Sequence, residues 1–445
     1  MRVVIVGAGQ VGSSIAEDLA DGHEVVVVER DSDRVEELTY SLDVLAIEGD
    51  GTSVDTLDEA GADAADMVIA STDDDETNLV VCSTAKAVGD GFTIARVKRT
   101  EFLKTWRRSE GAFGVDFMVC TNLLTAQTVV RVVGLPAAID VEVFAEGDVQ
   151  MAEFDVADDS TVAGETVAEA DRFDSLTFAA IIREGEVTVP TGGTRIRGGD
   201  RAVVIGSPES VRGFASTVAG IEGRREVDEA VVVGGSDVGY HVARLFVDRG
   251  IDVRLIEQDP DRARRLAEEL SDVVVLQSDA TDVDFLEREH VGEADVLVSS
   301  LDADEKNLLA CLLADRLGVD RTVSIVDSDT YIDLFETVGV DVAISPRAVV
   351  AEEITRFTRE GGAENVALIE SAEAEVIEVE VGNEGPLVGR TIREATADLP
   401  DRIVFGAITR DGAFVTPRGD TTLEPGDHVV AFAPAAAAEE LAAKL

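Results

Sequence analysis

Aromatic residues and cysteines are both scarce in this 445-residue sequence, at 4% Phe, Trp and Tyr and three cysteines. Hydrophobic residues still make up 45%, so we expect sizeable cores built from Val, Leu, Ile and Ala. Three cysteines, Cys82, Cys120 and Cys311, are too few for a disulfide framework, and they form no CxxC pair. The four histidines, His23, His241, His290 and His428, are too scattered to form a metal cluster. We expect the three thiols to be small buried side chains and predict no metal site.

Long hydrophobic runs are also absent, since no stretch approaches the roughly 20 apolar residues that a membrane helix needs. The first residues, MRVVIVGAGQVG, lack a basic leader and continue into a glycine motif instead of a cleavage site. The sequence therefore predicts a soluble, cytoplasmic protein.

Positive charge is the third scarcity. There are 38 Lys and Arg residues, only five of them lysines, against 90 Asp and Glu, for a net charge of −52. The acidic residues are spread along the chain, and a surface of this charge needs screening, which molar salt provides with a Debye length of roughly 3 Å. We interpret this composition as that of a salt-accumulating halophile. It excludes nucleic acid as a partner, because phosphate binding needs a basic surface.

The chain repeats itself. The segment ADMVIASTDDDETNLVVC matches ADVLVSSLDADEKNLLAC at a constant shift of 229 residues, and the glycine-rich start matches a stretch beginning at Glu229. The stretches that follow each copy also match each other and predict a small β-rich α+β domain with a short helix and a glycine-turned hairpin. We therefore predict the order large, small, large, small, with domains at 1–134, 135–223, 228–361 and 365–445.

Each large domain has the pattern of a nucleotide-binding α/β fold. An apolar strand, Arg2–Val6, runs into a glycine-rich turn, an amphipathic segment continues to Ala20, and a second apolar run, Val25–Val28, ends at Glu29. A GxGxxG turn between strand and helix, with an acid about 20 residues on, is typical of a dinucleotide site. The turn consists of Gly7, Ala8, Gly9, Gln10, Val11 and Gly12.

The roles of these residues follow from their chemistry. The glycines allow the tight turn and a close approach of the diphosphate, which the helix N-terminus attracts. Glu29 is expected to accept hydrogen bonds from a ribose diol and to repel a 2′-phosphate, which favours NAD(H) or an adenosine phosphate over NADP. The bland alternative is a glycine turn used only for packing.

Apolar runs then alternate with helical segments, which indicates a parallel sheet of the Rossmann-like type. Ligands of such sheets lie beyond the carboxyl ends of the strands, where Asp50, Thr72 and Asp73 are expected. We predict these residues as adenine or ribose contacts. With 90 acids in the chain, however, either aspartate is also explained as a solvated turn residue.

The second copy differs at its glycine turn, Gly234-Gly235-Ser236-Asp237-Val238-Gly239. Ser236 stands where the diphosphate comes closest, and Asp237 adds negative charge. Glu257 keeps the ribose acid, and Asp279 follows the third strand. This copy is therefore predicted either to bind a different nucleotide, to bind weakly, or to be structural. Its candidate contacts are Gly234, Ser236, Asp237, Val238, Gly239, Glu257 and Asp279.

The duplicated layout resembles the tandem regulator-of-potassium-conductance (RCK) architecture, and specifically the TrkA family of Trk potassium uptake systems. The residues that carry the resemblance are Gly7–Gly12, Glu29, Gly49–Gly51, Ala65–Asn78, Ile94–Val97, and the Gly-Asp pairs Gly199–Asp200 and Gly426–Asp427. The resemblance implies binding of NAD(H) and of ATP or ADP, with Arg96 and Lys98 near a nucleotide phosphate. It also implies a homotetrameric ring, peripheral on the inner face of the membrane, that regulates a separate potassium pore subunit.

Two other functions fit parts of the sequence. An NAD-dependent oxidoreductase uses the same glycine motif, but it needs a proton-transfer group near the nicotinamide. None of Tyr40, Tyr240 and Tyr331 belongs to a Tyr-x-x-x-Lys pair, and no separate catalytic domain is evident, so we predict that the protein is not an enzyme. A nucleotide sensor for a different ion transporter remains open on sequence grounds.

Overall fold

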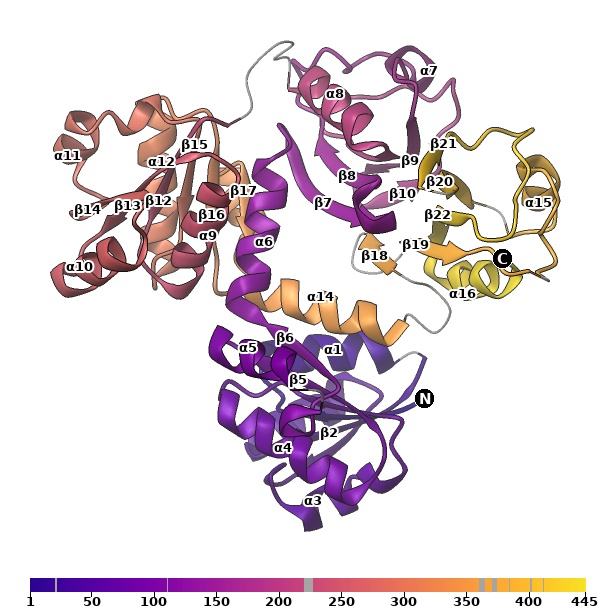
Figure 1. Cartoon of the computed structure of the whole chain (residues 1–445), viewed down its shortest axis with the longest axis horizontal. Coiled ribbons are helices and arrows are strands. Elements are labelled where there is room, and N and C mark those ends of the chain that lie inside the picture. Colours follow the sequence, from indigo (N-terminus) through magenta and orange to yellow (C-terminus); the bar gives the residue numbers. More distant parts are fainter. Residues whose placement is uncertain are drawn as a thin grey trace. The chain divides into compact units, whose positions relative to one another are not determined.

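A computed structural model describes residues 1–445 except 21, 110, 220–226, 360–364, 370–373, 384, 401 and 411. By their contacts the residues form two units, one of Met1–Val130 with Val227–Thr355 and one of Arg131–Glu226 with Arg356–Leu445. The first unit thus holds both Rossmann-like domains and the second holds both small domains (Figure 1).

The first Rossmann-like domain is a six-stranded sheet in the order β3-β2-β1-β4-β5-β6, with every pair parallel. Its strands are β1 (Arg2–Val6), β2 (Glu24–Glu29), β3 (Leu45–Glu48), β4 (Met67–Ala70), β5 (Phe92–Val97) and β6 (Phe117–Cys120). Its helices are α1 (Gln10–Ala20), α2 (Ser32–Ser41), α3 (Val54–Glu59), α4 (Asp75–Val88), α5 (Thr100–Arg108) and α6 (Thr121–Val133), with short 3-10 turns η1 (Ala62–Ala64) and η2 (Ala112–Gly114). This is the predicted doubly wound sheet.

The second Rossmann-like domain repeats this order as β14-β13-β12-β15-β16-β17. Its strands are β12 (Glu229–Val233), β13 (Asp252–Glu257), β14 (Val273–Gln277), β15 (Val296–Ser299), β16 (Thr322–Ile325) and β17 (Val342–Ile344). Its helices are α9 (Asp237–Asp248), α10 (Pro260–Glu269), α11 (Val283–Arg288), α12 (Asp304–Leu317), α13 (Ile332–Val338) and α14 (Pro346–Arg359), with turns η4 (Val291–Glu293) and η5 (Asp329–Tyr331).

The small domains are five-stranded and mostly antiparallel, in the orders β10-β9-β11-β8-β7 and β18-β19-β22-β20-β21. The first consists of β7 (Ala138–Phe144), η3 (Ala145–Gly147), β8 (Val149–Asp155), α7 (Val167–Ala170), β9 (Leu176–Arg183), β10 (Glu186–Thr188), β11 (Arg201–Gly206) and α8 (Pro208–Val218). The second consists of β18 (Asn365–Ile369), β19 (Ala374–Glu380), α15 (Ile392–Ala397), β20 (Val404–Arg410), β21 (Ala413–Val415), β22 (His428–Pro434) and α16 (Ala435–Lys444).

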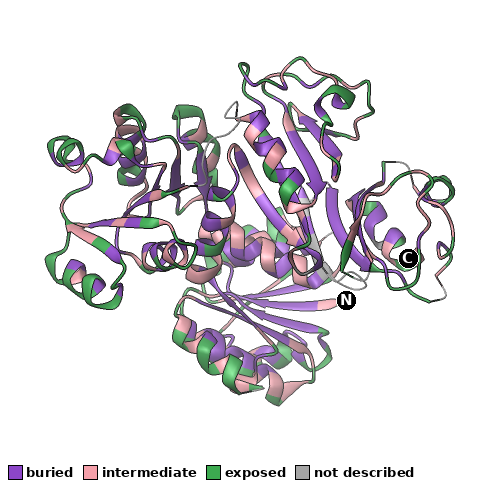
Figure 2. Cartoon of the chain, turned by 45° about the horizontal axis from the view of Figure 1, so that its top comes forward, coloured by how far each residue is buried: buried purple, intermediate pink, exposed green. Residues whose placement is uncertain are grey.

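The apolar runs of the sequence become the buried sheets, and the polar faces of the helices are exposed (Figure 2). Val3, Val4 and Ile5 are fully buried in β1, as expected for a strand covered on both faces. The three cysteines are free and buried, as predicted.

The two small domains share one core. Apolar side chains from both sheets pack into a single cluster that includes Phe144, Met151, Ile205, Val376 and Phe432. Thr177 in β9 also donates a hydrogen bond of 2.9 Å to the carbonyl of Gly406 in β20. The small domains are therefore paired by their sheets, which the order of the sequence does not show.

The Gly-Asp pairs of the small domains have a structural role. Asp200 is 2% exposed, and both of its carboxylate oxygens accept hydrogen bonds of 2.6 Å from Arg183. Asp427 is fully buried and accepts in the same way from Arg410, at 2.6 and 2.9 Å. These bidentate pairs tie the turn before the last strand to the hairpin of each small domain.

Of the predicted domain junctions, residues 223–226 and 361–364 lie outside the described residues. Gly134 and Leu135 lie directly after α6. The exact domain boundaries stay predictions.

Candidate nucleotide-binding sites

The first glycine turn has a geometry that only glycine satisfies at two positions. Gly7 adopts φ +100°, and its amide donates to the carbonyl of Val28 at 2.9 Å. A Cβ at Gly12 would lie 1.8 Å from the carbonyl oxygen of Gly7. The first and last glycines therefore allow the turn itself and the close packing of α1 on β1.

Gly9 has a different role, because the space in front of it is open. The only atom within 4 Å of an ideal Cβ there is a guanidinium nitrogen of Arg34, at 3.9 Å. Helix α1 begins at the next residue, the exposed Gln10, while Ala8 and Val11 are buried in the turn. The N-terminus of α1 therefore lies behind this open space, and the diphosphate site there stays a prediction.

Glu29 lies beside the turn and holds it in place. One carboxylate oxygen accepts from the amide of Ala8 at 2.6 Å, and the other accepts from the amides of Arg30 and Asp31 at 2.7 and 3.0 Å. Each carboxylate oxygen has two acceptor sites, so the oxygen bound to Ala8 retains capacity for a ribose hydroxyl. The structure thus brings Glu29 and the glycine turn together.

Asp50 lies in the turn after β3. Its carboxylate accepts from Arg30 at 2.7 Å, and from the amide and hydroxyl of Thr52 at 2.9 and 2.7 Å. The hydrogen bond from Arg30, followed by those from Thr52, lowers the pKa of Asp50 to about 2. Asp50 is therefore a negatively charged, half-exposed group on the β2–β3 side of the sheet edge.

Thr72 and Asp73 follow β4, and Arg96 lies near the end of the adjacent β5. The Arg96 side chain is 5% exposed, and its Nη1 lies 3.4 Å from a carboxylate oxygen of Asp73. Lys98 contacts the same oxygen from 3.5 Å. Burial alone raises the pKa of Asp73, but the positive charges of Lys98 and Arg96 outweigh it, so the pKa is lowered.

The residue that organises this edge of the sheet was not predicted from the sequence. Asn78 is 1% exposed, and its side-chain oxygen accepts from the amide of Thr72 at 2.9 Å. Its side-chain nitrogen donates to the carbonyls of Thr72 and Arg96 at 2.9 and 2.8 Å. Asn307 makes the matching contacts with Leu301 and Ile325 in the second copy, so the repeated asparagine was the available signal.

The second glycine turn keeps the same backbone geometry. Gly234 adopts φ +93°, and a Cβ at Gly239 would lie 2.1 Å from the carbonyl oxygen of Gly234. Val238 is buried, and the amide of Gly235 donates to Glu257 at 2.8 Å, as Ala8 does to Glu29. The turn and its acid are therefore conserved in geometry between the two copies.

The differences lie at the helix N-terminus. The Ser236 hydroxyl accepts from the amide of Gly239 at 3.1 Å and caps α9, so one amide of this helix N-terminus is already hydrogen-bonded within the protein. Asp237 adds a carboxylate 3.6 Å from Arg262, whose guanidinium also donates to the carbonyl of Gly235 at 2.8 Å. The guanidinium of Arg262 and one amide at the N-terminus of α9 therefore already have hydrogen-bond partners within the protein.

Asp279 occupies the position of Asp50 in the second copy. It accepts from the amide and hydroxyl of Thr281 at 2.9 and 2.8 Å, and these hydrogen bonds lower its pKa. Gln258 takes the place of Arg30 and donates to Asp279 at 3.2 Å. The turn at Asp279 thus has the same hydrogen bonds from threonine as the turn at Asp50, but a glutamine, Gln258, in place of Arg30.

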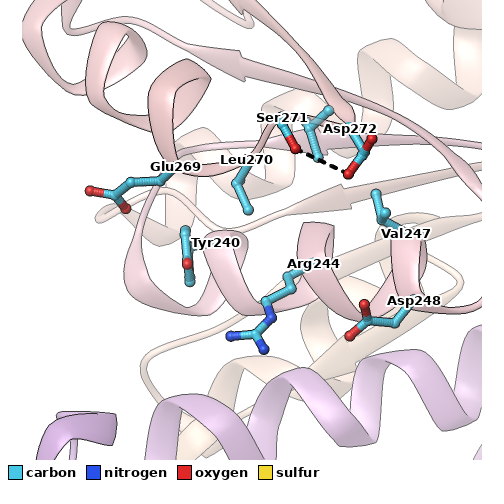
Figure 3. Close-up of a pocket in the computed structure, with 9 residues that line it drawn as sticks. Tyr240, Arg244, Val247, Asp248, Glu269, Leu270, Ser271 and Asp272 are labelled. Carbon is cyan, nitrogen blue, oxygen red and sulfur yellow. Dashed lines mark hydrogen bonds between the residues drawn. The ribbon is translucent and has the colours of Figure 1, made fainter.

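An open hollow of about 340 Å³ lies elsewhere, against the second half of α9 and the start of β14 (Figure 3). None of the predicted nucleotide residues lines it. Its lining carries Arg244 and three carboxylates, those of Asp248, Glu269 and Asp272. In the part of the chain that the structure describes, no group of His, Cys, Asp or Glu side chains is arranged to hold a metal ion.

The comparisons with known proteins agree with this architecture. The sequence profile of the TrkA-N domain matches residues 3–121 and 230–346, and that of the TrkA-C domain matches residues 151–219 and 376–445. A solved structure of the GsuK channel bound to NAD superposes with a TM-score of 0.62 at 20% identity, covering 98% of this chain and 77% of that one. At that identity the likeness shows the fold alone.

Two relatives match over nearly their whole length. A Trk system potassium uptake protein TrkA homolog of Archaeoglobus fulgidus is 36% identical, with 97% of each chain covered. A TrkA homolog 1 of Methanosarcina mazei is 34% identical, with 99% of each chain covered. The duplicated glycine turns, the paired small domains and these full-length matches show that the chain belongs to the TrkA family.

Proposed function

We propose that the protein is the peripheral regulatory subunit of a potassium uptake system, which binds nucleotides and controls a separate pore subunit in the membrane. The proposal rests mainly on one observation: the chain is similar to TrkA proteins over its full length, and it contains two Rossmann-like TrkA-N domains. Among the residues that the structure describes, no helix has the length and apolarity to cross a bilayer. In this proposal the pore is a different chain, on which the protein docks from the cytoplasm.

The first Rossmann-like domain is the proposed principal site. Gly7–Gly12 and the N-terminus of α1 bind the diphosphate of NAD(H) or the phosphates of ATP or ADP. Glu29 binds the ribose, and its negative charge disfavours NADP(H). Asp50 follows β3, and Thr72 and Asp73 follow β4, at the carboxyl ends of the strands. Asp50 and Asp73 are the proposed adenine or ribose contacts. The open space at Gly9 supports this assignment.

Regulation requires the protein to have two shapes with different nucleotide affinities, because a ligand shifts an equilibrium only by its differential affinity. The similarity to RCK architecture suggests a homo-oligomeric ring, typically a tetramer, as the element that changes shape. An oxidoreductase is the alternative. Tyr40 is 83% exposed and Tyr331 is 45% exposed. Tyr240 directly follows the second glycine turn, but the residue four positions on is Arg244, so it forms no Tyr-x-x-x-Lys pair.

The first test is thermal unfolding in molar KCl with and without NADH, NAD, NADPH, ADP and ATP. A ligand at about 100 times its dissociation constant stabilises the folded state by roughly 2.7 kcal/mol. We expect stabilisation by NAD(H) or adenosine phosphates but not by NADPH, and no consumption of NADH. Failure of every nucleotide to stabilise the protein would overturn the proposal.

The second test addresses the partner. Potassium flux into vesicles that contain a Trk-type pore subunit from the same organism should change when this protein is added, and change again with the nucleotide that binds. A nucleotide-stabilised protein that leaves flux unchanged would instead indicate a sensor for another transporter.

A further inference from the structure

Three cations converge at the mouth of the first glycine turn, and one of them comes from the other half of the chain. Arg96 and Lys98 lie at the end of β5, while Arg347 is the second residue of α14. Arg347 donates from Nη1 to the side-chain oxygen of Gln10, the first residue of α1, and from Nη2 to Asp327 at 3.0 Å. Both contacts lie within the unit that the two Rossmann-like domains form.

The positive charge of Arg347 acts on two neighbouring side chains, those of Arg96 and Asp73. Burial lowers the pKa of Arg96, and the like charge of Arg347 lowers it further, against the attraction of Asp73. Arg347 also helps to lower the pKa of Asp73, after Lys98 and Arg96. In a chain of net charge −52, these three cations form ion pairs with two carboxylates, those of Asp73 and Asp327, while the charge of Asp75 also acts on Arg96.

Backbone anchors identify the matching positions in the second copy. Asn78 binds the carbonyl of Arg96, and Asn307 binds that of Ile325 in the same way. The amide of Lys98 donates to Asp75 at 2.9 Å, and the amide of Asp327 donates to Asp304 at 2.9 Å. The second copy thus has Ile325 in place of Arg96 and Asp327 in place of Lys98.

The third position follows from strand register. Arg96 pairs with Val119 and Ile325 pairs with Ile344, so Asn122 is the counterpart of Arg347. Asn122 lies 3.5 Å from Asp237 of the second copy, as Arg347 contacts Gln10 of the first. These two contacts lie at equivalent positions, but the charged residue is a cation, Arg347, in one and an anion, Asp237, in the other. At the positions of Arg96, Lys98 and Arg347 the second copy has Ile325, Asp327 and Asn122, none of which is a cation.

We propose that Arg347 is a phosphate ligand of the first nucleotide site, which makes that site a joint product of both halves of the chain. This rests on the proposed function. The two contacts named above use two of the five N–H donors of the guanidinium, which leaves donors for an anion beside Arg96 and Lys98. The ligand class is a nucleotide with a phosphate chain. Its binding strengthens the contact between α14 and the N-terminus of α1.

The test compares nucleotides that differ only in phosphate number. Dissociation constants of ATP, ADP, AMP and adenosine are measured by calorimetry at one fixed KCl concentration, for the wild type and for Arg347→Gln. Glutamine keeps a hydrogen-bond donor near Gln10 but removes the charge. We expect a loss of at least about ten-fold for ATP, a smaller loss for AMP and none for adenosine. Arg347→Lys should recover part of the ATP affinity.

Asn122→Ala is the matched control, because it removes the equivalent contact of the second copy. It should leave every dissociation constant unchanged. An equal loss for all four ligands in Arg347→Gln means that Arg347 only holds the halves together, and unchanged ATP binding means that it does not contact phosphate; either result overturns the inference. A wild type that binds no nucleotide instead rejects the proposed function itself.

Discussion

At the scale of single residues, the glycine turn makes the most severe demand on side-chain size. A methyl group at Gly12 would lie 1.8 Å from the carbonyl oxygen of Gly7, so either α1 or β1 must move. We expect Gly12→Ala to lower the free energy of unfolding by about 1–3 kcal/mol, measured by urea titration.

Gly22 provides the control for that substitution. Apart from its chain neighbours, no described residue has an atom within 4 Å of a Cβ there, so Gly22→Ala should change stability by less than about 0.5 kcal/mol. If the two variants unfold at the same urea concentration, the packing of α1 on the turn is looser than described.

Glu29 gives a prediction about ligand choice. Its carboxylate faces the place where a ribose 2′-substituent is expected, so Glu29→Gln should remove the repulsion of a 2′-phosphate. The ratio of the dissociation constants of NADPH and NADH, measured by fluorescence titration, should fall by roughly ten-fold. Glu257→Gln, the same change in the second copy, should leave the ratio unaltered. An unaltered ratio in Glu29→Gln would remove Glu29 from the ribose site.

At the scale of elements, strand β7 holds a carboxyl group that is costly to ionise. Burial, with the nearby charge of Glu142, raises the pKa of Asp140 to about 6, against the opposing charge of Arg131. The unfolded chain loses this proton near pH 4, so the folded state binds more protons between about pH 4 and 6. The contribution of Asp140 to stability therefore falls as pH rises through that window.

Asp140→Asn should remove this dependence. The variant should be more stable than the wild type above pH 6, by at most about 3 kcal/mol, and the difference should vanish near pH 4. Urea unfolding at pH 4.5 and 7.5 measures both values. A variant that is less stable at pH 7.5 would show that the Asp140 carboxylate is ionised and well paired.

Most elements with a local pattern were predicted correctly. The predicted strand Arg2–Val6 is β1 with the same bounds, and the apolar run Val25–Val28 lies within β2. Strands β7 and β18 were not predicted. In β7 the acids Asp140 and Glu142 interrupt the apolar pattern, and Glu142 is satisfied by Arg131 and by Arg356, more than 200 residues away. Arg356 lies outside any local window of the sequence around β7, so its pairing with Glu142 could not be predicted from that window.

At the scale of the whole molecule, the net charge of −52 predicts a strong dependence on salt. Raising KCl from 0.1 to 1 M shortens the Debye length from about 10 to 3 Å and weakens self-repulsion. The unfolding temperature should therefore rise across this range. NaCl at the same ionic strength should have the same effect, and a protein equally stable at both salt concentrations would contradict the halophile interpretation.

The duplicated order was evident from the sequence, but the grouping of the copies was not. Residues in register 229 positions apart show which segments are alike, yet they do not show that like segments pack together. The contact between Gln10 and Arg347 is an example of packing that the sequence does not show, because neither residue belongs to a periodic pattern from which the contact could be predicted. Arg347 of the second half thus lies beside the glycine turn of the first half, a position that the sequence alone does not indicate.

The shared core of the small domains has a consequence for protein synthesis. Phe144, Met151 and Ile205 leave the ribosome long before Val376 and Phe432, which cover them in the finished molecule. At about 5–20 residues per second, the delay is on the order of 10 to 40 s. During that time the nascent first half presents an uncovered apolar sheet, to which a neighbouring nascent chain on the same messenger RNA can bind in place of its own second half.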